Sequence, residues 1–282
     1  MPRGWWPWPT AVGWSTRNVG EMLNDDDRAN AAAALERAQL DREPIAPLTE
    51  TFPAMDVADA YEIQLINIER RLTNGSVVRG HKVGLSSRAM QQMMGVDEPD
   101  YGHLLHDMFF FEDSDVVTSN YCYPRVEVEV AFVLGQPLTG PACTVADVLR
   151  ATEYVVPAIE LIDSRIRDWR IKLPDTIADN ASSAGVVLGG NPRRLTQLDV
   201  RMIAAVLRRN GRVVETGVSG AVLGNPATAV AWLANKVHAF GVTLEAGHVI
   251  LPGSCTRAID VAPGDHIRAD FAELGHVAVS FV

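Results

Sequence analysis

Two glutamates separated by a single residue stand inside an otherwise apolar segment. The run from Pro124 to Leu134, PRVEVEVAFVL, has the apolar alternation of a β-strand. Because successive side chains of a strand point to opposite faces, Glu127 and Glu129 are expected on one face and the valines on the other. Carboxylates held about 7 Å apart along a strand repel each other, and a cation beside them would stabilise the pair. An exposed strand face with two solvated glutamates is the alternative.

A third carboxylate strengthens the prediction of a metal site. Glu160 lies in the apolar run PAIELID, where an unpaired charge is costly to bury. Its neighbour Asp163 could instead pair with Arg165. Acidic groups from two strands, with no cysteine and no histidine pair nearby, favour oxygen ligands for Mg²⁺ or Mn²⁺ over a structural zinc site.

Two glycine-containing segments are predicted to form loops at a substrate site. GHKVG places Lys82 between glycines at a strand end, where it could bind a carboxylate or move a proton. EPDYG is a rigid turn that presents Asp100, which could act as an acid or base if burial raises its pKa. Taken singly, these are more often a surface lysine and a turn-forming aspartate. The segment 175–185 is rich in small polar groups and is expected to line the same pocket.

Helices and then strands are expected to position these side chains. Ala31 to Leu40 has a helical pattern, and Asp56 is expected to cap a second helix that ends at Asn74-Gly75. The chain then breaks into short apolar runs that predict strands at Val77 to Leu85, His103 to Phe111, Val126 to Leu134 and Val155 to Ile162.

The last third predicts a hairpin, a helix and further strands. Asn210-Gly211 lies between two apolar runs and predicts a type I′ turn. Asn225-Pro226 opens a helix over Ala227 to Phe240, which Gly241 ends. From His248 onward, short strands joined by Pro-Gly turns are expected.

These patterns predict an α+β protein with a mixed, β-rich body. Residues 22–76 form a helical N-terminal section, and residues 77–282 form a β-rich, metal-dependent catalytic domain. Residues 1–21 are rich in Trp and Pro, and Met22 precedes a helix-starting run. We therefore expect 1–21 to be a disordered extension or the product of a misassigned start codon.

Charge and cysteine content exclude several classes of partner. The formal net charge is −10 and no basic block occurs, which argues against nucleic-acid and anionic-membrane partners. The 3 cysteines are few, odd in number and far apart, so they fit neither a disulfide framework nor a C-x-x-C motif. A reducing, cytoplasmic location is expected. No signal peptide is recognised in the first 21 residues.

Five runs resemble one known family. The sequence from about Asp27 to the C-terminus resembles the 2-keto-4-pentenoate hydratase and 4-oxalocrotonate decarboxylase family of the fumarylacetoacetate hydrolase superfamily. The runs that carry this resemblance are GHKVGLSS (80–87), GVDEPDYG (95–102), PRVEVE (124–129), PAIE (157–160) and GNP (224–226).

This resemblance implies a fold, a site and a reaction. The fold is the mixed β-rich fumarylacetoacetase C-terminal type. Glu127, Glu129 and Glu160 hold Mg²⁺ or Mn²⁺, and the pocket contains the residues Lys82, Asp100 and Ser182. The hydrolases of the superfamily usually carry a lysine in the stretch corresponding to Asp179, and its absence speaks against C–C bond hydrolysis.

The implied activity is a lyase reaction, the hydration of a small-molecule 2-hydroxy-dienoate. The substrate is a 2-hydroxypenta-2,4-dienoate or its one-carbon-longer homologue, from aromatic or steroid ring degradation, and the product is a 4-hydroxy-2-oxo acid. Asp100 or Lys82 assists protonation at C5, and water adds at C4. A homo-oligomer, built from pentameric rings, and a pathway aldolase or sister enzyme as partner are also implied.

Two alternatives stay open. The first is a 4-oxalocrotonate decarboxylase, whose substrate has a second carboxylate that needs another cationic contact, such as Arg125 or Arg165. The second is a catalytically silent metal-binding partner of another pathway enzyme. The presence of Glu127, Glu129, Glu160 and Lys82 together disfavours the second.

Overall fold

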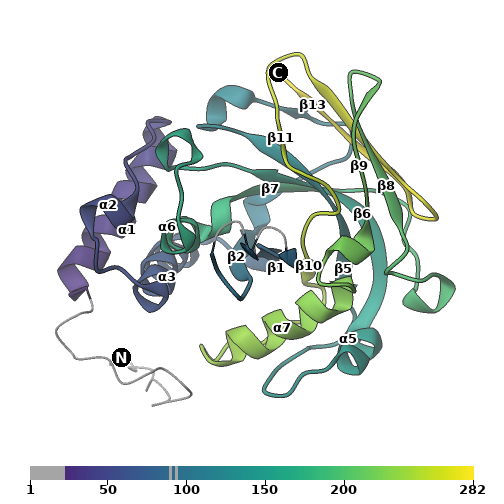
Figure 1. Cartoon of the computed structure of the whole chain (residues 1–282), viewed down its shortest axis with the longest axis horizontal. Coiled ribbons are helices and arrows are strands. Elements are labelled where there is room, and N and C mark those ends of the chain that lie inside the picture. The colour runs from purple at the N-terminus through teal and green to yellow at the C-terminus, as the bar shows by residue number, and fades with distance from the viewer. Residues whose placement is uncertain (1–22, 89–90, 93–94) are drawn as a thin grey trace.

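A helical N-terminal section packs on a strand-rich body in the computed structural model, which describes residues 23–88, 91–92 and 95–282 (Figure 1). The Trp-rich segment 1–21 lies outside the described residues. Figure 1 shows α1, α2, α3 and α6 gathered on one side of the strands. The α-helices are α1 (Asp25–Asp41), α2 (Leu48–Thr51), α3 (Val57–Thr73), α5 (Val145–Ala151), α6 (Leu173–Ala178) and α7 (Pro226–His238).

An eight-stranded mixed sheet has the strand order β2-β1-β10-β5-β6-β7-β3, with β11 paired to β5. It carries all the predicted site residues except Ser182. Its two longest strands, β5 and β6, pair antiparallel and set Glu127 directly opposite Glu160. The strands are β1 (Val78–Gly84), β2 (Asp100–Leu105), β3 (Phe109–Phe110), β5 (Arg125–Leu134), β6 (Thr152–Ile162), β7 (Ser183–Leu188), β10 (Val249–Leu251) and β11 (Ile259–Asp260).

The two faces of this sheet differ. Because side chains alternate along a strand, every second residue of β5 enters the large core that the sheet shares with the helices. The residues between them face the other way. Along that inner face of β5 the two glutamates are followed by Ala131 and Val133, which belong to a small apolar cluster with Val156, Ala158, Val186 and Leu251. The inner face is thus charged at one end and apolar at the other.

A second sheet with the order β4-β13-β12-β8-β9 contains the predicted hairpin. Its turn residues Asn210 and Gly211 have φ values of 52° and 79°, which confirms the type I′ turn. Its strands are β4 (Asp115–Val116), β8 (Ala204–Arg209), β9 (Arg212–Val218), β12 (His266–Phe271) and β13 (Gly275–Phe281).

The predicted helices are confirmed, with small shifts at their ends. Helix α1 begins at Asp25 because the Asn24 side chain accepts the backbone N–H of Asp27. Asp56 caps α3 as expected. Gln64 of α3 donates its side-chain amide to the carbonyl oxygens of Tyr101 and Ile177, at 3.0 and 2.8 Å. The helical section is therefore hydrogen-bonded to β2 and α6. β2 begins with Asp100, and the turn after α6 contains Ser182.

One predicted strand is wrong in extent. The apolar run His103 to Phe111 is broken after Leu105 by a 3-10 turn over His106–Met108, and only Phe109–Phe110 resumes as β3. The two pieces pair with different neighbours, β2 with β1 and β3 with β7. An apolar pattern alone does not reveal such a change of partner.

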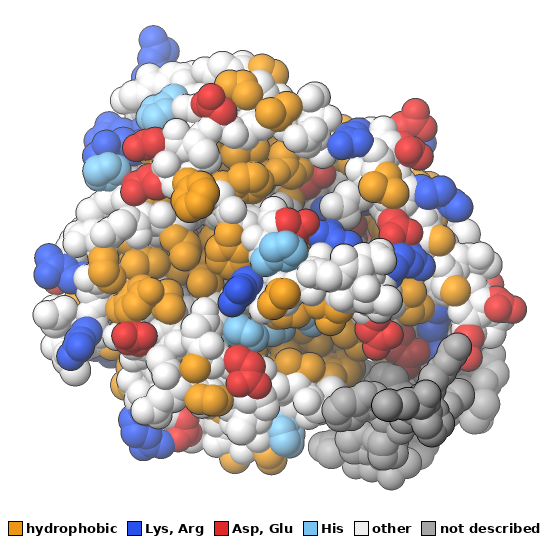
Figure 2. Space-filling model, turned by 180° about the vertical axis from the view of Figure 1, so that it is seen from behind, with side chains coloured by type: hydrophobic (Ala, Val, Ile, Leu, Met, Phe, Trp, Pro, Cys, Tyr) orange, Lys and Arg blue, Asp and Glu red, His pale blue; other side chains and the backbone are white. Residues whose placement is uncertain are grey.

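Charges of both signs share the surface, and the helices are short or polar. On the face in Figure 2, basic and acidic side chains are interspersed among one another. In the described ranges, none of the helices combines the length and apolarity needed to cross a bilayer.

Gly80 offers a test of how tightly β1 is held. A Cβ at this position would lie 1.9 Å from the Val249 carbonyl oxygen of the parallel neighbour β10. We expect Gly80→Ala to lower the free energy of unfolding by about 3 kcal/mol, measured by chemical denaturation. Gly190→Ala is the matched control, because a Cβ there meets only the Glu112 carboxylate at 3.8 Å. Equal stability of the two variants would contradict this packing.

Candidate metal and acid–base site

Three glutamates from adjacent strands form a compact carboxylate cluster. Glu127 and Glu129 lie on β5 and Glu160 on β6, and one oxygen of each lies within 4.8 Å of the others. Glu129 and Glu160 have no exposed surface, and Glu127 is half-buried. This burial rules out the alternative of two solvated glutamates on an exposed strand face.

The electrostatics of the cluster fit a bound divalent cation. Burial raises the pKa of all three carboxyl groups, and a neighbouring carboxylate adds to each shift. The pKa of Glu160 rises to about 7. Within the described chain, Glu129 Oε1 is buried and has no hydrogen-bond partner. Oxygen ligands that are crowded, dehydrated and unpartnered suit a hard ion of the Mg²⁺ or Mn²⁺ type.

A backbone amide holds the second oxygen of Glu129. Gly253 donates its N–H to Glu129 Oε2 at 2.7 Å. The φ of Gly253 is +125°, and a Cβ there would meet Ser86 Oγ at 1.6 Å, so only glycine fits. Pro252-Gly253 was predicted as a turn, but the structure has no turn there. Gly253 instead orients a carboxylate, a role that its sequence did not reveal.

Lys82 lies beside the cluster, but not in the predicted loop. It is a residue of β1, with 4% of its surface exposed, and its Nζ lies 3.3 Å from Glu160 Oε1. Nζ also donates to the Ala181 carbonyl oxygen at 3.0 Å. Burial lowers the pKa of Lys82, but the carboxylates, Glu160 foremost, outweigh it and raise that pKa above its ordinary value. Lys82 is therefore a fixed ammonium.

Asp100 is the first residue of β2, again in a strand and not in the predicted turn. It is 1% exposed, and its Oδ1 has no hydrogen-bond partner in the described structure. Burial raises the pKa of Asp100, and the charge of Lys82 opposes part of that rise. Gly84 permits this placement, since a Cβ there would lie 2.1 Å from Oδ1. The flanking glycines thus serve close approach between strands.

Ser182 lies in a left-handed turn whose preceding residue, Ala181, contacts Lys82. The 3-10 turn η4 (Asn180–Ser182) connects α6 to β7, and its residues have φ values of 53°, 49° and 57°. Ser182 is 4% exposed, and its Oγ has no partner among the described residues. Consecutive left-handed residues other than glycine are uncommon and concentrate at functional sites. The sequence pointed to this segment through its small polar residues, but not to its conformation.

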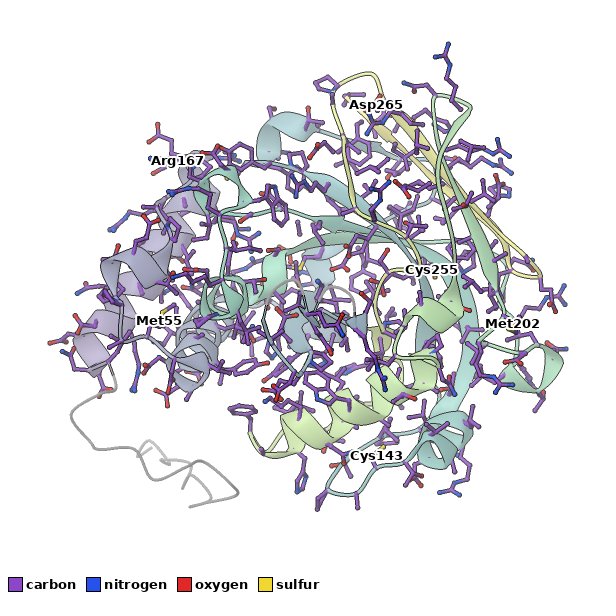
Figure 3. The ribbon with its side chains drawn as sticks, viewed as in Figure 1. Met55, Cys143, Arg167, Met202, Cys255 and Asp265 are labelled. Carbon is purple, nitrogen blue, oxygen red and sulfur yellow. The ribbon has the colours of Figure 1, made fainter. Side chains whose placement is uncertain are left out.

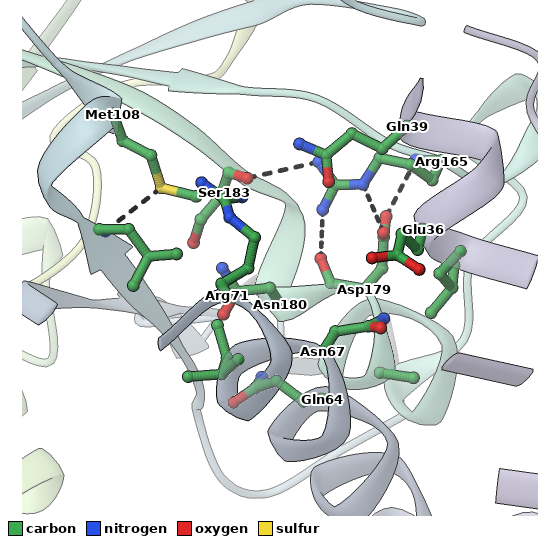
Figure 4. Close-up of a pocket in the computed structure, with 14 residues that line it drawn as sticks. Glu36, Gln39, Gln64, Asn67, Arg71, Met108, Arg165, Asp179, Asn180 and Ser183 are labelled. Carbon is green, nitrogen blue, oxygen red and sulfur yellow. Dashed lines mark hydrogen bonds and ion pairs between the residues drawn. The ribbon is translucent and has the colours of Figure 1, made fainter. Parts of the chain in front are cut away.

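The proposed pairing of Asp163 with Arg165 is wrong. Asp163 accepts the backbone N–H groups of Cys122 and Tyr123. Arg165 instead binds Asp179, with its Nε 2.5 Å from Oδ1 (Figure 4). Burial raises the pKa of Asp179 to about 6, although Arg165 counteracts the rise.

Neither arginine considered for a second substrate carboxylate is unpaired. Arg165 is committed to Asp179. Arg125 forms an ion pair with Asp260 at 2.7 Å and stacks over the Trp169 ring at 4.4 Å.

The cysteines take no part in this cluster. All three are free, and Figure 3 shows Cys143 and Cys255 in separate regions of the fold. Burial raises the pKa of the Cys255 thiol to about 12. This agrees with the prediction that the cysteines form no disulfide framework.

Comparisons with known proteins place these features in a family. Residues 80–282 match the family model of the fumarylacetoacetate (FAA) hydrolase C-terminal domain. The chain is 46% identical to the 2-oxo-hept-4-ene-1,7-dioate hydratase of Escherichia coli, over 93% of this chain and 100% of that protein. It is 44% identical to the 2-keto-4-pentenoate hydratase of Paraburkholderia xenovorans (strain LB400), over 92% and 96% of the two chains.

A solved structure agrees over nearly the same length. The 4-oxalocrotonate decarboxylase from Pseudomonas putida G7, complexed with magnesium and adipate, superposes with a TM-score of 0.89 at 38% identity. The match covers 92% of this chain and 99% of that one. The resemblance and the mixed β-rich fold expected from the sequence are thus confirmed, and the chain belongs to the fumarylacetoacetate hydrolase C-terminal family.

Proposed function

We propose that this protein is a metal-dependent hydratase that adds water to a 2-hydroxypenta-2,4-dienoate or a close homologue and yields a 4-hydroxy-2-oxo acid. The single observation that carries the proposal is the buried Glu127, Glu129 and Glu160 cluster with Lys82 and Asp100 beside it. Relatives at 46% and 44% identity that are named as hydratases support it.

The three glutamates would hold Mg²⁺ or Mn²⁺. When bound, this cation supplies Lewis acidity at the C2 oxygen of the substrate. Lys82, fixed by Ala181 and Glu160, provides positive charge for the substrate carboxylate. Glu160 and the other carboxylates around Lys82 raise its pKa and favour its protonated form.

Asp100 is then the better candidate for the proton transfer. Its unpartnered Oδ1 and raised pKa suit an acid that delivers a proton to C5. The buried Ser182 hydroxyl can donate a hydrogen bond to the reacting molecule. Protonation at C5 with loss of the C2 hydroxyl proton gives an α,β-unsaturated ketone, to which water then adds, with its hydroxyl at C4 and a proton at C3.

A decarboxylase is the second candidate. The structural neighbour at 38% identity carries that name, and so does a relative from Pseudomonas sp. (strain CF600) at 41% identity. Against it stand the ion pairs that engage Arg125 and Arg165, which leave no free guanidinium among these two for a second carboxylate.

We also infer a cellular setting. A 4-hydroxy-2-oxo acid is an aldol, so an aldolase or sister enzyme of aromatic or steroid ring degradation would consume it in the cytoplasm. The exposed valines of the edge strand β9, Val213, Val214 and Val218, support a homo-oligomer. A monomeric mass in light scattering would refute the oligomer.

Removal of one carboxylate tests the metal site. We expect Glu129→Gln to lower kcat about 100- to 1,000-fold, because the charge that holds the cation is lost. Titration calorimetry should show weaker Mg²⁺ binding. Glu153→Gln, at an exposed position of β6, should leave both unchanged. Full activity of Glu129→Gln in the presence of a chelator would contradict the proposal.

The metal should stabilise the fold in a pH-dependent way. The pKa of Glu160 is raised from 4.5 to about 7 in the folded protein. A group with a raised folded pKa stabilises the fold fully below its unfolded pKa, and this contribution is lost as the pH rises through about 7. Mg²⁺ binds the deprotonated carboxylates, which predominate above pH 7. We therefore expect Mg²⁺ to raise Tm by several degrees more at pH 8 than at pH 5, in thermal melts with Mg²⁺ or with chelator. The same increase at both pH values would count against the cluster as the binding site.

One assay separates the two candidate reactions. Freshly generated 2-hydroxypenta-2,4-dienoate and 4-oxalocrotonate are supplied in separate reactions, with diene absorbance and CO₂ release recorded. We expect consumption of the first without CO₂. Faster turnover of the second with CO₂ release would establish the decarboxylase instead.

A further inference from the structure

The turn η4 contains one group that contacts Lys82 and one buried hydroxyl. The Ala181 carbonyl oxygen accepts the Lys82 ammonium at 3.0 Å. The buried Ser182 Oγ is unpartnered in the described chain. Both positions depend on left-handed backbone that residues other than glycine adopt only when their surroundings fix it. The contacts that hold this turn therefore also set the geometry of the site.

The Asn180 side chain fastens the turn to an edge strand. Its Oδ1 accepts the His103 N–H at 2.8 Å, and its Nδ2 donates to the His103 carbonyl oxygen at 3.0 Å. His103 lies on β2, the last strand in the order of its sheet. The carboxamide thus pairs with β2 as the backbone of a further strand would.

The fit between turn and strand is close. A Cβ at Gly102 would lie 2.3 Å from the Asn180 carbonyl oxygen and 2.5 Å from Ser183 Oγ. The backbone of the turn therefore lies directly against β2, where no larger residue than glycine is accommodated.

Arg165 holds the two ends of the same turn. Its backbone N–H and Nε donate to the Asp179 carboxylate, and its Nη2 donates to the Asp179 carbonyl oxygen. Nη1 donates to the Ser183 carbonyl oxygen at 3.3 Å. Figure 4 shows Arg165 and Asp179 together with Asn180 and Ser183 around the pocket behind the turn. Arg165 thus binds the residues on either side of η4, Asp179 and Ser183, and Asn180 binds η4 to β2.

We propose that Asn180 is a positioning residue for the reaction: by pairing with the edge of β2 it holds η4 left-handed, so that the Ala181 carbonyl oxygen orients the Lys82 ammonium beside the carboxylate cluster. This inference rests on the proposed hydratase function. Asn180 belongs to neither the metal ligands nor the proton-transferring groups, and it acts through the turn alone.

Substitution of Asn180 should affect turnover more than metal binding. Loss of the bonds between Asn180 and His103 leaves Glu127, Glu129 and Glu160 in place, so the metal still binds. The Lys82 ammonium loses its alignment, and misplacement by about 1 Å costs on the order of 100-fold in rate. We expect kcat to fall about 100-fold and KM to rise, because Lys82 is no longer aligned with the substrate carboxylate, while Mg²⁺ affinity stays nearly unchanged.

Two variants of Asn180 and one matched control test the inference. Asn180→Asp keeps the size of the side chain and replaces the Nδ2 donor with an oxygen. Asn180→Gly removes both bonds to His103, adds no charge and tolerates the φ of 53°. The control is Asn235→Asp, because Asn235, a residue of α7 outside the carboxylate cluster, makes the same pair of bonds with Cys143, at 2.8 and 2.9 Å.

Kinetics, thermal melts and amine labelling are measured on all of these proteins. We expect all three substitutions to lower Tm, but only the Asn180 variants to lose kcat. Labelling of Lys82 by an amine-reactive reagent, read by peptide mass spectrometry, should rise in the Asn180 variants and stay at the wild-type level in Asn235→Asp.

The outcomes are distinct. Wild-type kcat, or wild-type labelling of Lys82, in both Asn180 variants would overturn the inference. An equal loss of kcat in Asn235→Asp would also overturn it, because general loosening would then explain the effect. The labelling needs no substrate, so a wild-type protein that fails to hydrate the dienoate would refute the proposed function alone.

Discussion

Repulsion among three buried carboxylates is the constraint on which the rest of this structure depends. Two long antiparallel strands bring Glu127 opposite Glu160, with Glu129 next along the same face. Dehydrated like charges at this separation are unfavourable unless positive charge compensates them. Lys82 supplies one such charge within the chain, and the proposed divalent cation supplies the remainder. The backbone amide of Gly253 and the register of β5 with β6 then keep the carboxylates in place.

Patterns within short segments of the sequence correctly predicted the facing of strand residues, the helix starts and one hairpin turn. The alternation in 124–134 placed both glutamates on one face, and Asn24, Asp56 and Asn225 begin helices as capping residues do. The Asn210-Gly211 turn followed from its steric preference. These features depend on residues a few positions apart, so a single sequence contains the information.

Contacts between segments that are far apart in the sequence were not predicted. The glycines around Lys82 were interpreted as loop formers, whereas they permit close packing of β1 against β10 and of Gly84 against Asp100. The partner of Arg165 was wrongly assigned because Asp179 becomes adjacent to it only after α6 reverses the chain. The left-handed turn after α6 was missed for the same reason, since Asn180 is stabilised by a strand far away in sequence.

The parallel pairing of β1 with β10 has a consequence for how the protein acquires activity. It joins residues near position 80 to residues near position 250, so it closes only when almost the whole chain is available. Contacts of such long sequence separation form slowly and late. During synthesis the N-terminal helices and the β5–β6 pair can form first. A chain still on the ribosome would then carry its carboxylates without Gly253, and catalytic competence would arrive as one of the last events of folding.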